Sequence, residues 1–405
     1  MRKFILLGIG LVWLLLPVMS VAGVYNSCEQ YDAVIDSNGI FTNDFAKFDR
    51  TLTEIKRVQN DTDKFYVPLR ERAMLVISLY EKSKTAKQGN GLGFGRQPLP
   101  GPTKKLDEEI RLMDLSAYYL RLGRLDRTRK PVDLIKAENL LPRLKLGSNF
   151  LLYSNLGTIN QTQGKANQAA TMLGLARSFW PSDYDALKKN PQDPAWKLVD
   201  RLGWNKRQFD WYRRADFFQF QLALLQAREQ ENNSSDDGPY QLFVKDKKPV
   251  EFVGPDGTFQ PGTLKKSEKD KLPPDAVPIV QQLLLWLPGE SRLEFLLAEL
   301  LNARGDVQEA YSLLKVYHQK LKGGLPKSML SRFRKLETHI AEEKAKAEQA
   351  LTQGLEDDLN KKGKVIEPPP PILPNWQTFV VGFGTGCVFA LLGYWQVRVF
   401  TRPRR

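Results

Sequence analysis

A spacing of large and small residues that recurs along the chain is the feature that most constrains its fold. The clearest copy comprises Tyr153, Leu156, Gly157, Asn160, Gly164, Ala169, Leu173, Ala176 and Pro181. The small side chains of Gly157 and Ala169 let two antiparallel helices approach closely, and Gly164 permits a tight turn between them. Proline does not fit inside a helix, so Pro181 ends the second one. The spacing therefore predicts a helical hairpin over 153–181.

The same spacing recurs twice in weaker form. The later copy comprises Leu297, Ala298, Leu301, Gly305, Ala310 and Leu314, with Glu294 in place of the large aromatic residue and no closing proline. An earlier, degenerate copy comprises Leu112, Leu115, Ser116, Tyr119, Gly123, Thr128 and Val132. Together the copies resemble the tetratricopeptide repeat (TPR), a pair of helices about 34 residues long. The resemblance implies an array of stacked hairpins that presents a groove to a peptide or protein partner.

Most of the remaining body follows helical periodicity, with two interruptions. Residues 88–102 are rich in glycine and proline and predict a loop, which lacks the glycine spacing of a nucleotide site. Residues 232–274 contain two apolar alternations, 240–244 and 250–253, and the turn-forming residues between them predict a small β-hairpin. This insertion either contacts a partner or packs against neighbouring helices.

The N-terminal end has the layout of a signal peptide. Arg2 and Lys3 precede an uncharged apolar run, and a small-residue cleavage site ends at Ala22, directly before Gly23. The alternative is an uncleaved anchor helix. In both cases the chain that follows lies outside the cytoplasm.

The C-terminal end predicts one membrane span. The uncharged stretch from Trp376 to Val397 is long enough for a helix, at about 1.5 Å per residue, to cross a hydrocarbon core of roughly 30 Å. Arginines crowd the tail that follows it, which indicates a cytoplasmic C-terminus. Cys28 is the only thiol of the exported body, so a bacterial envelope is the better expectation. We expect a single-pass protein of the cytoplasmic (inner) membrane with a periplasmic body.

The expected fold is mainly α: a TPR-like α-solenoid of helical hairpins with a small β-hairpin insertion and one C-terminal transmembrane helix. The expected segments are the signal peptide (1–22), an N-terminal helical region with the Gly-rich loop (23–104), TPR-like repeats (105–231), the insertion (232–274), a C-terminal repeat with a cap helix (275–360), a Pro-rich linker (361–375), the transmembrane helix (376–397) and a basic tail (398–405).

Composition and motif content exclude several chemistries. Two cysteines and two histidines are too few for disulfide scaffolds, zinc ribbons or iron–sulfur clusters. Neither His318 nor His339 accompanies a catalytic motif, and the acidic runs lack the spacing of a calcium loop. We expect no catalytic residue, no cofactor and no metal site. The net charge is +14, but we expect no nucleic-acid partner because the body is exported.

Partner binding is expected on the first helices of the hairpins, offset from their core stripes. At about 100° per residue, Ser154, Thr158 and Gln161 of the clearest copy turn away from the paired helix. The corresponding residues of the later copy are Arg292, Phe295, Glu299 and Asn302. We expect this partner groove to take a protein or peptide of unknown identity.

A second contact surface is expected in the transmembrane helix. Gly382, Gly386 and Ala390 recur at every fourth position, and small residues at this spacing allow close helix packing. The helix would then pair with a second copy or with a partner helix. The alternative is a helix that tolerates glycine without pairing.

The function expected from these features is a non-catalytic, membrane-anchored scaffold for protein–protein interaction outside the cytoplasm. Two alternatives remain. One is an accessory subunit for the assembly or secretion of an envelope complex, and the other is an enzyme with an unrecognised site.

Overall fold

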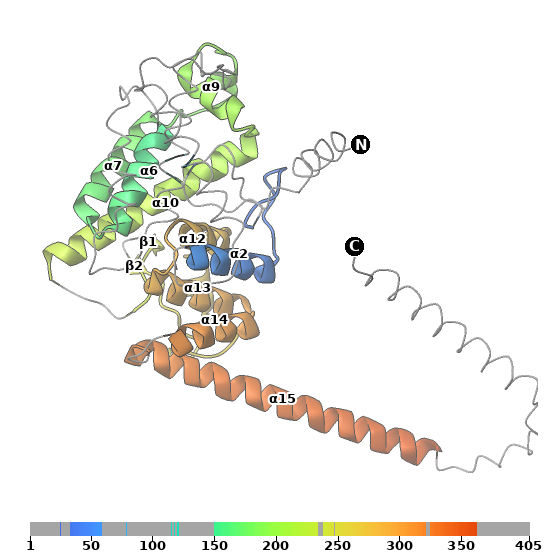
Figure 1. Ribbon diagram of the computed structural model, residues 1–405. Helices are drawn as coiled ribbons and strands as arrows, with labels where there is room; N and C mark the ends of the chain where they lie inside the picture. The colour runs from blue at the N-terminus through green and yellow to red at the C-terminus, as the bar shows by residue number, and fades with distance from the viewer. Residues whose placement is uncertain are drawn as a thin grey trace, which may run out of the picture. The chain divides into compact units, whose positions relative to one another are not determined.

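A computed structural model of the protein describes residues 25, 33–58, 78, 115, 117, 120, 150–233, 238–246, 248–320 and 325–362 (Figure 1). The predicted signal peptide, Gly-rich loop, linker and transmembrane helix lie outside these residues, as does most of the degenerate copy. Within them the fold is mainly α with one small sheet. The chain divides into two compact units, Met1–Ile340 and Ala341–Arg405.

Helices make up most of the described chain. In order, the elements are α2 (Phe45–Val58), α6 (Phe150–Thr162), α7 (Ala166–Phe179), α8 (Tyr184–Lys188), α9 (Pro194–Arg201), α10 (Lys206–Glu231), β1 (Val244–Lys245), β2 (Lys248–Pro249), α11 (Lys266–Lys269), α12 (Ala276–Trp286), α13 (Ser291–Arg304), α14 (Val307–Lys320) and α15 (Lys327–Lys362). None of the helices in this part of the chain combines the length and apolarity that a bilayer crossing needs.

The predicted first hairpin is confirmed as the pair α6 and α7. At Gly157 an added Cβ would lie 2.4 Å from Leu173 Cγ, so the two helices approach at a position where only glycine fits. Gly164 has a φ of 74° in the turn between them, a conformation that glycine adopts without strain. The helix α7 ends at Phe179, before Pro181.

The later copy forms the second hairpin, α13 and α14. The helix α13 ends at Gly305, which takes the left-handed conformation with a φ of 98°. Ala298 and Ala310 are buried, as small residues at a close helix crossing should be. A hairpin therefore forms here without the aromatic residue and the closing proline of the first copy.

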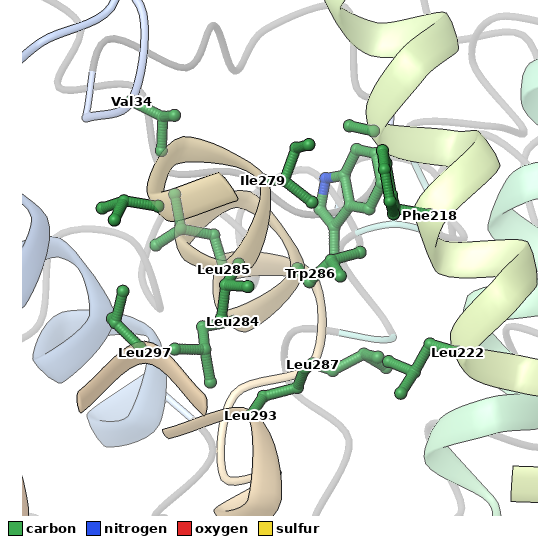
Figure 2. Close-up of a cluster of buried hydrophobic side chains, with 14 of the residues drawn as sticks. Val34, Phe218, Leu222, Ile279, Leu284, Leu285, Trp286, Leu287, Leu293 and Leu297 are labelled. Carbon is green, nitrogen blue, oxygen red and sulfur yellow. The ribbon is translucent and has the colours of Figure 1, made fainter. Parts of the chain in front are cut away.

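The helix α12 lies at the centre of the apolar core of the first unit (Figure 2). All its residues except Pro278 are buried, and it packs against α2, α10 and α13. Its composition is apolar on nearly every face, which suits burial on all sides. Gln281 and Gln282 are the polar exceptions, and Gln282 Oε1 accepts a hydrogen bond from Trp211 Nε1 at 3.3 Å.

Tyr25 reaches this core from much earlier in the chain. Its side chain is buried, and its ring centroid lies 5.6 Å from the ring centroids of both Trp204 and Trp286. Its backbone N–H donates to Asn155 Oδ1 at 3.0 Å, and its backbone oxygen accepts from Asn155 Nδ2 at 3.2 Å. One asparagine of α6 therefore satisfies both backbone groups of Tyr25.

The predicted β-hairpin is confirmed in a short form. The strands β1 and β2 are antiparallel, with Val244 opposite Pro249 and Lys245 opposite Lys248. Asp246 has a φ of 52° in the turn. The chain then continues to α11 without further regular structure.

Candidate functional site

The predicted binding face of the first hairpin is buried against α10. Ser154, Thr158 and Gln161 are 1%, 3% and 8% exposed. Thr158 Oγ1 and Gln161 Oε1 both accept from Gln219 Nε2, at 2.8 and 3.2 Å. Gln161 Nε2 donates to Gln226 Oε1 at 2.8 Å. A polar face of α10 covers these three side chains, so in this structure the face that was predicted to bind a partner is occupied by another helix of the same chain.

The amino-acid sequence of α10 contains a signal for this polar face. Asp216, Gln219, Gln226 and Gln230 fall on one side of a helix at about 100° per residue. Gln230 Nε2 donates to the backbone oxygen of Gly164 at 2.8 Å, so the polar contacts continue to the turn of the hairpin. A polar row on a helix whose neighbouring faces are rich in aromatic and aliphatic residues indicates a polar partner face, because buried polar groups need hydrogen-bond partners.

Asp216 is the carboxylate in this row of α10 side chains. Burial raises its pKa to about 7, although hydrogen bonds involving Ser154 and Trp180 act in the opposite direction. Trp180 Nε1 donates to Asp216 Oδ2 at 3.1 Å. The carboxyl therefore takes up a proton far more readily than an exposed aspartate does.

The corresponding face of the second hairpin begins with Arg292 and Phe295. Phe295 is fully buried in the core. Arg292 Nη1 pairs with Glu229 Oε2 at 2.7 Å, and its guanidinium carbon lies 4.0 Å from the ring centroid of Tyr240. Both of these predicted groove side chains are therefore engaged within the chain.

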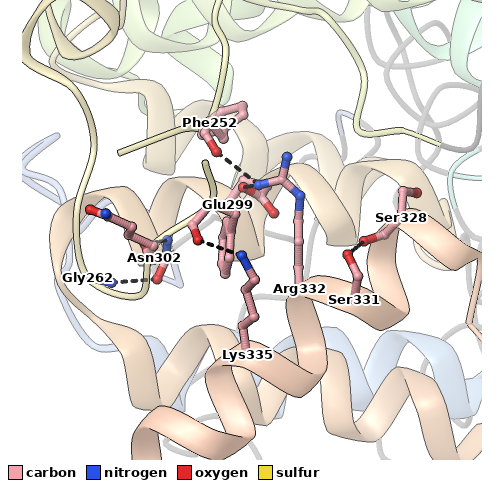
Figure 3. A network of polar contacts seen from close by, with 10 residues as sticks. Phe252, Gly262, Glu299, Asn302, Ser328, Ser331, Arg332 and Lys335 are labelled. Atoms are coloured by element: carbon pink, nitrogen blue, oxygen red, sulfur yellow. Dashed lines mark hydrogen bonds and ion pairs between the residues drawn. The ribbon is translucent and has the colours of Figure 1, made fainter. Parts of the chain in front are cut away.

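Glu299 and Asn302 complete this face, and both are buried beneath a segment of the insertion. We call residues 252–262 the strap. Asn302 Nδ2 donates to the backbone oxygen of Gln260 at 3.2 Å, and Asn302 Oδ1 accepts from the backbone N–H of Gly262 at 2.8 Å (Figure 3). One amide side chain thus holds the turn at 260–263, where Gly262 has a φ of 72°, through both a carbonyl and an N–H.

The helix α15 supplies the other contacts to the strap (Figure 3). Lys335 Nζ donates to the backbone oxygen of Phe259 at 3.2 Å. Arg332 Nη1 donates to the backbone oxygen of Phe252 at 2.9 Å, and its guanidinium carbon lies 4.7 Å from the ring centroid of Phe259. We call Glu299, Asn302, Arg332 and Lys335 the clamp.

Within the clamp, Glu299 fixes the position of Arg332. Glu299 Oε2 lies 2.8 Å from Arg332 Nη1, and the Glu299 side chain is 2% exposed. Burial raises the pKa of Glu299, and the adjacent Arg332 guanidinium opposes this shift. The ion pair holds the guanidinium between the ring and the backbone of the strap.

The strap is closed at its base and turned at its tip. The backbone N–H of Lys265 donates to the oxygen of Val253 at 2.9 Å, and that of Gly254 donates to the oxygen of Thr258 at 2.7 Å. The sequence left two alternatives for the insertion: contact with a partner, or packing against neighbouring helices. The structure shows the packing against neighbouring helices.

Arg332 and Lys335 were not among the predicted site residues. They flank the apolar stripe of α15, where basic side chains are usually solvated, and no motif marks a contact to backbone. The predicted packing residues Gly382, Gly386 and Ala390 lie outside the described residues. Where the structure describes the chain, no group of three or more histidine, cysteine or acidic side chains is arranged to hold a metal ion.

We compared the chain with known protein families, curated proteins and solved structures. No protein-family model, curated protein or solved structure matches the chain.

Proposed function

We propose that the protein is a non-catalytic, membrane-anchored scaffold outside the cytoplasm whose clamp binds a short polypeptide segment through its backbone. The single observation that carries the proposal is the contact of the clamp with the strap. Lys335 and Asn302 bind three backbone groups of the four consecutive residues 259–262. Backbone groups are common to all polypeptides, so the same side chains suit a partner segment of similar course.

The strap then acts as the internal occupant of the site. A partner segment gains access only in the fraction of molecules whose strap is released, and its apparent affinity falls by that fraction. The cation–π contact between Arg332 and Phe259 favours a partner with an aromatic residue at the corresponding position. Exported location and membrane attachment rest on the sequence features of the two chain ends.

We also infer that the two hairpins are copies of one TPR-like unit. Gly164 and Gly305 occupy equivalent positions and share the left-handed conformation, and Ala169 and Ala310 are both 0% exposed. In each case a later helix lies on the face offset from the hairpin core: α10 contacts Thr158, and α15 contacts Glu299. This common arrangement supports a repeat origin beyond the matching residues themselves.

The test uses a fluorescent peptide with the sequence of Gly257–Leu264 and the full-length protein in detergent. Phe259→Ala weakens the strap, so we expect this variant to bind the peptide and the wild type to bind it much less. Adding Lys335→Ala should weaken binding about fivefold, as the loss of one hydrogen bond of ~1 kcal/mol implies. Arg334→Ala, at an exposed neighbouring position of α15, is the matched control and should leave binding unchanged.

Fluorescence anisotropy gives the affinities, and the thermal unfolding midpoint shows whether each variant is folded. A folded Phe259→Ala protein that does not bind the peptide would contradict the proposal. Equal affinities of the Lys335→Ala and Arg334→Ala variants would show that the peptide binds elsewhere.

A further inference from the structure

The second unit begins with a long exposed stretch of α15. In the first unit, Met329, Phe333 and Leu336 of this helix are buried. Every residue from Ala341 to Glu356 is exposed. Leu351 and Leu355 are 67% and 58% exposed, more than the other large apolar side chains in the described chain. Among the residues of this unit that the structure describes, the apolar stripe of the helix is therefore left uncovered.

The sequence around this stripe is symmetric about Leu351. On one side, Ala347 and Lys344 precede it at four and seven positions; on the other, Leu355 and Asp358 follow it at the same distances. At about 100° per residue these five positions share one face of the helix. From its N-terminal to its C-terminal end, this face carries one basic residue, then three apolar residues, then one acidic residue.

We propose that this face pairs with the same face of a second copy of the chain, antiparallel and centred on Leu351. The two-fold axis then places Leu351 against Leu351, and Ala347 against Leu355. Lys344 of each copy faces position 358, an aspartate, in the other. A parallel pair in register would instead oppose Lys344 to Lys344, and like charges at a helix interface disfavour that arrangement.

The charges at one edge of the stripe support the same arrangement. Glu343 and Lys361 lie at the same edge of the face by helical register. In an antiparallel pair, this edge of one helix lies beside the same edge of the other helix. Glu343 of one chain is then close to position 361 of the other. An anionic lipid surface is a poorer occupant, because acidic residues outnumber lysines between Ala341 and Lys362.

The first experiment is disulfide trapping of the full-length protein in detergent, with Cys28→Ser and Cys387→Ser removing the native thiols. Leu351→Cys should form a covalent dimer rapidly under mild oxidation. Lys344→Cys, on the same face but away from the two-fold axis, should form at least tenfold less. Efficient trapping of Lys344→Cys alone would overturn the antiparallel arrangement, and absence of trapping at Leu351→Cys would overturn the pairing.

The second experiment is a charge exchange measured by light scattering after size-exclusion chromatography. Lys344→Glu and Asp358→Lys should each lower the fraction of dimer, since each opposes like charges. An equimolar mixture of the two variants should recover dimer, because the mixed pair restores opposite charges at both ends. Gly386→Ile separates this surface from the predicted transmembrane contact and should leave the Leu351→Cys product unchanged. Wild type that is monomeric throughout, or a mixture that recovers no dimer, would contradict the proposal.

Discussion

Asp216 is the residue whose burial has the clearest consequence for stability. Its pKa is raised from 3.8 to about 7 in the folded protein. At pH values between these two pKa values, the Asp216 carboxyl is protonated in the folded protein and ionised in the unfolded chain. The free energy of unfolding therefore falls as pH rises through this range, and it levels off above about pH 7. At about 1.4 kcal/mol for each unit of pKa difference, the total loss in the free energy of unfolding across this pH range is about 4 kcal/mol.

We therefore expect Asp216→Asn to raise the free energy of unfolding at pH 8 by up to about 4 kcal/mol. The amide keeps an oxygen that accepts from Trp180, but it carries no charge. Urea unfolding between pH 4 and 8 measures the change, and most of the decline with pH should disappear. Asp210→Asn, at a half-exposed position of α10, is the control. The same pH profile in wild type and Asp216→Asn would contradict the assignment.

Gly157 supports a second prediction at this scale. Because an added Cβ would lie 2.4 Å from Leu173 Cγ, Gly157→Ala should lower the free energy of unfolding by about 1–3 kcal/mol. Gly174→Ala is the control within the same hairpin, since its Cβ would be 3.4 Å from Phe220. Alanine favours helix by up to ~1 kcal/mol over glycine, so the control should be neutral or stabilising. Equal losses in the two variants would argue against a close crossing at Gly157.

The same residues show how far sequence reasoning reaches. Gly157 was predicted correctly because a small residue at a hairpin crossing has a local cause. Helical register placed Ser154, Thr158 and Gln161 away from the paired helix, but it did not identify α10 as the helix that covers them. Which helix covers a face depends on contacts between distant segments, and a buried threonine has the same local sequence context as a solvated one.

At the scale of elements, the strap depends on the clamp for its position. Asn302→Ala removes two hydrogen bonds and leaves the N–H of Gly262 unsatisfied, which should destabilise the strap locally by about 1–3 kcal/mol. Hydrogen exchange in peptides covering 252–264 should become faster, while exchange in α12 stays slow. Gln308→Ala, on an exposed position of α14, should not change it. Unchanged exchange in the strap of Asn302→Ala would show that apolar packing alone holds it.

The insertion was predictable as an element but not in its course. Alternation and turn residues gave the β-hairpin correctly. The strap has no periodicity of its own, and its position follows from Asn302, Arg332 and Lys335, which lie on two helices and contact backbone atoms that no side-chain pattern identifies.

At the scale of the whole molecule, the topology remains a prediction from the two chain ends. We expect protease added to cells with a permeabilised outer layer to digest the body and to leave only the predicted span and tail. An antibody against the C-terminal tail should detect a small protected fragment by immunoblot. A cytoplasmic protein of the same cells is the control for sealed membranes. An intact body under these conditions would contradict the exported arrangement.

The burial of Tyr25 also bears on the order in which the molecule is completed. Its ring packs against Trp286, so the core contains residues from early and late in synthesis. Because the chain is synthesised from its N-terminus, this contact cannot form until Trp286 has been made. Until then the cluster of Tyr25, Trp180, Trp204 and Tyr212 lacks the ring of Trp286, and incompletely covered apolar surfaces are where nascent chains aggregate or recruit chaperones. Completion of this aromatic cluster therefore waits for the synthesis of α12.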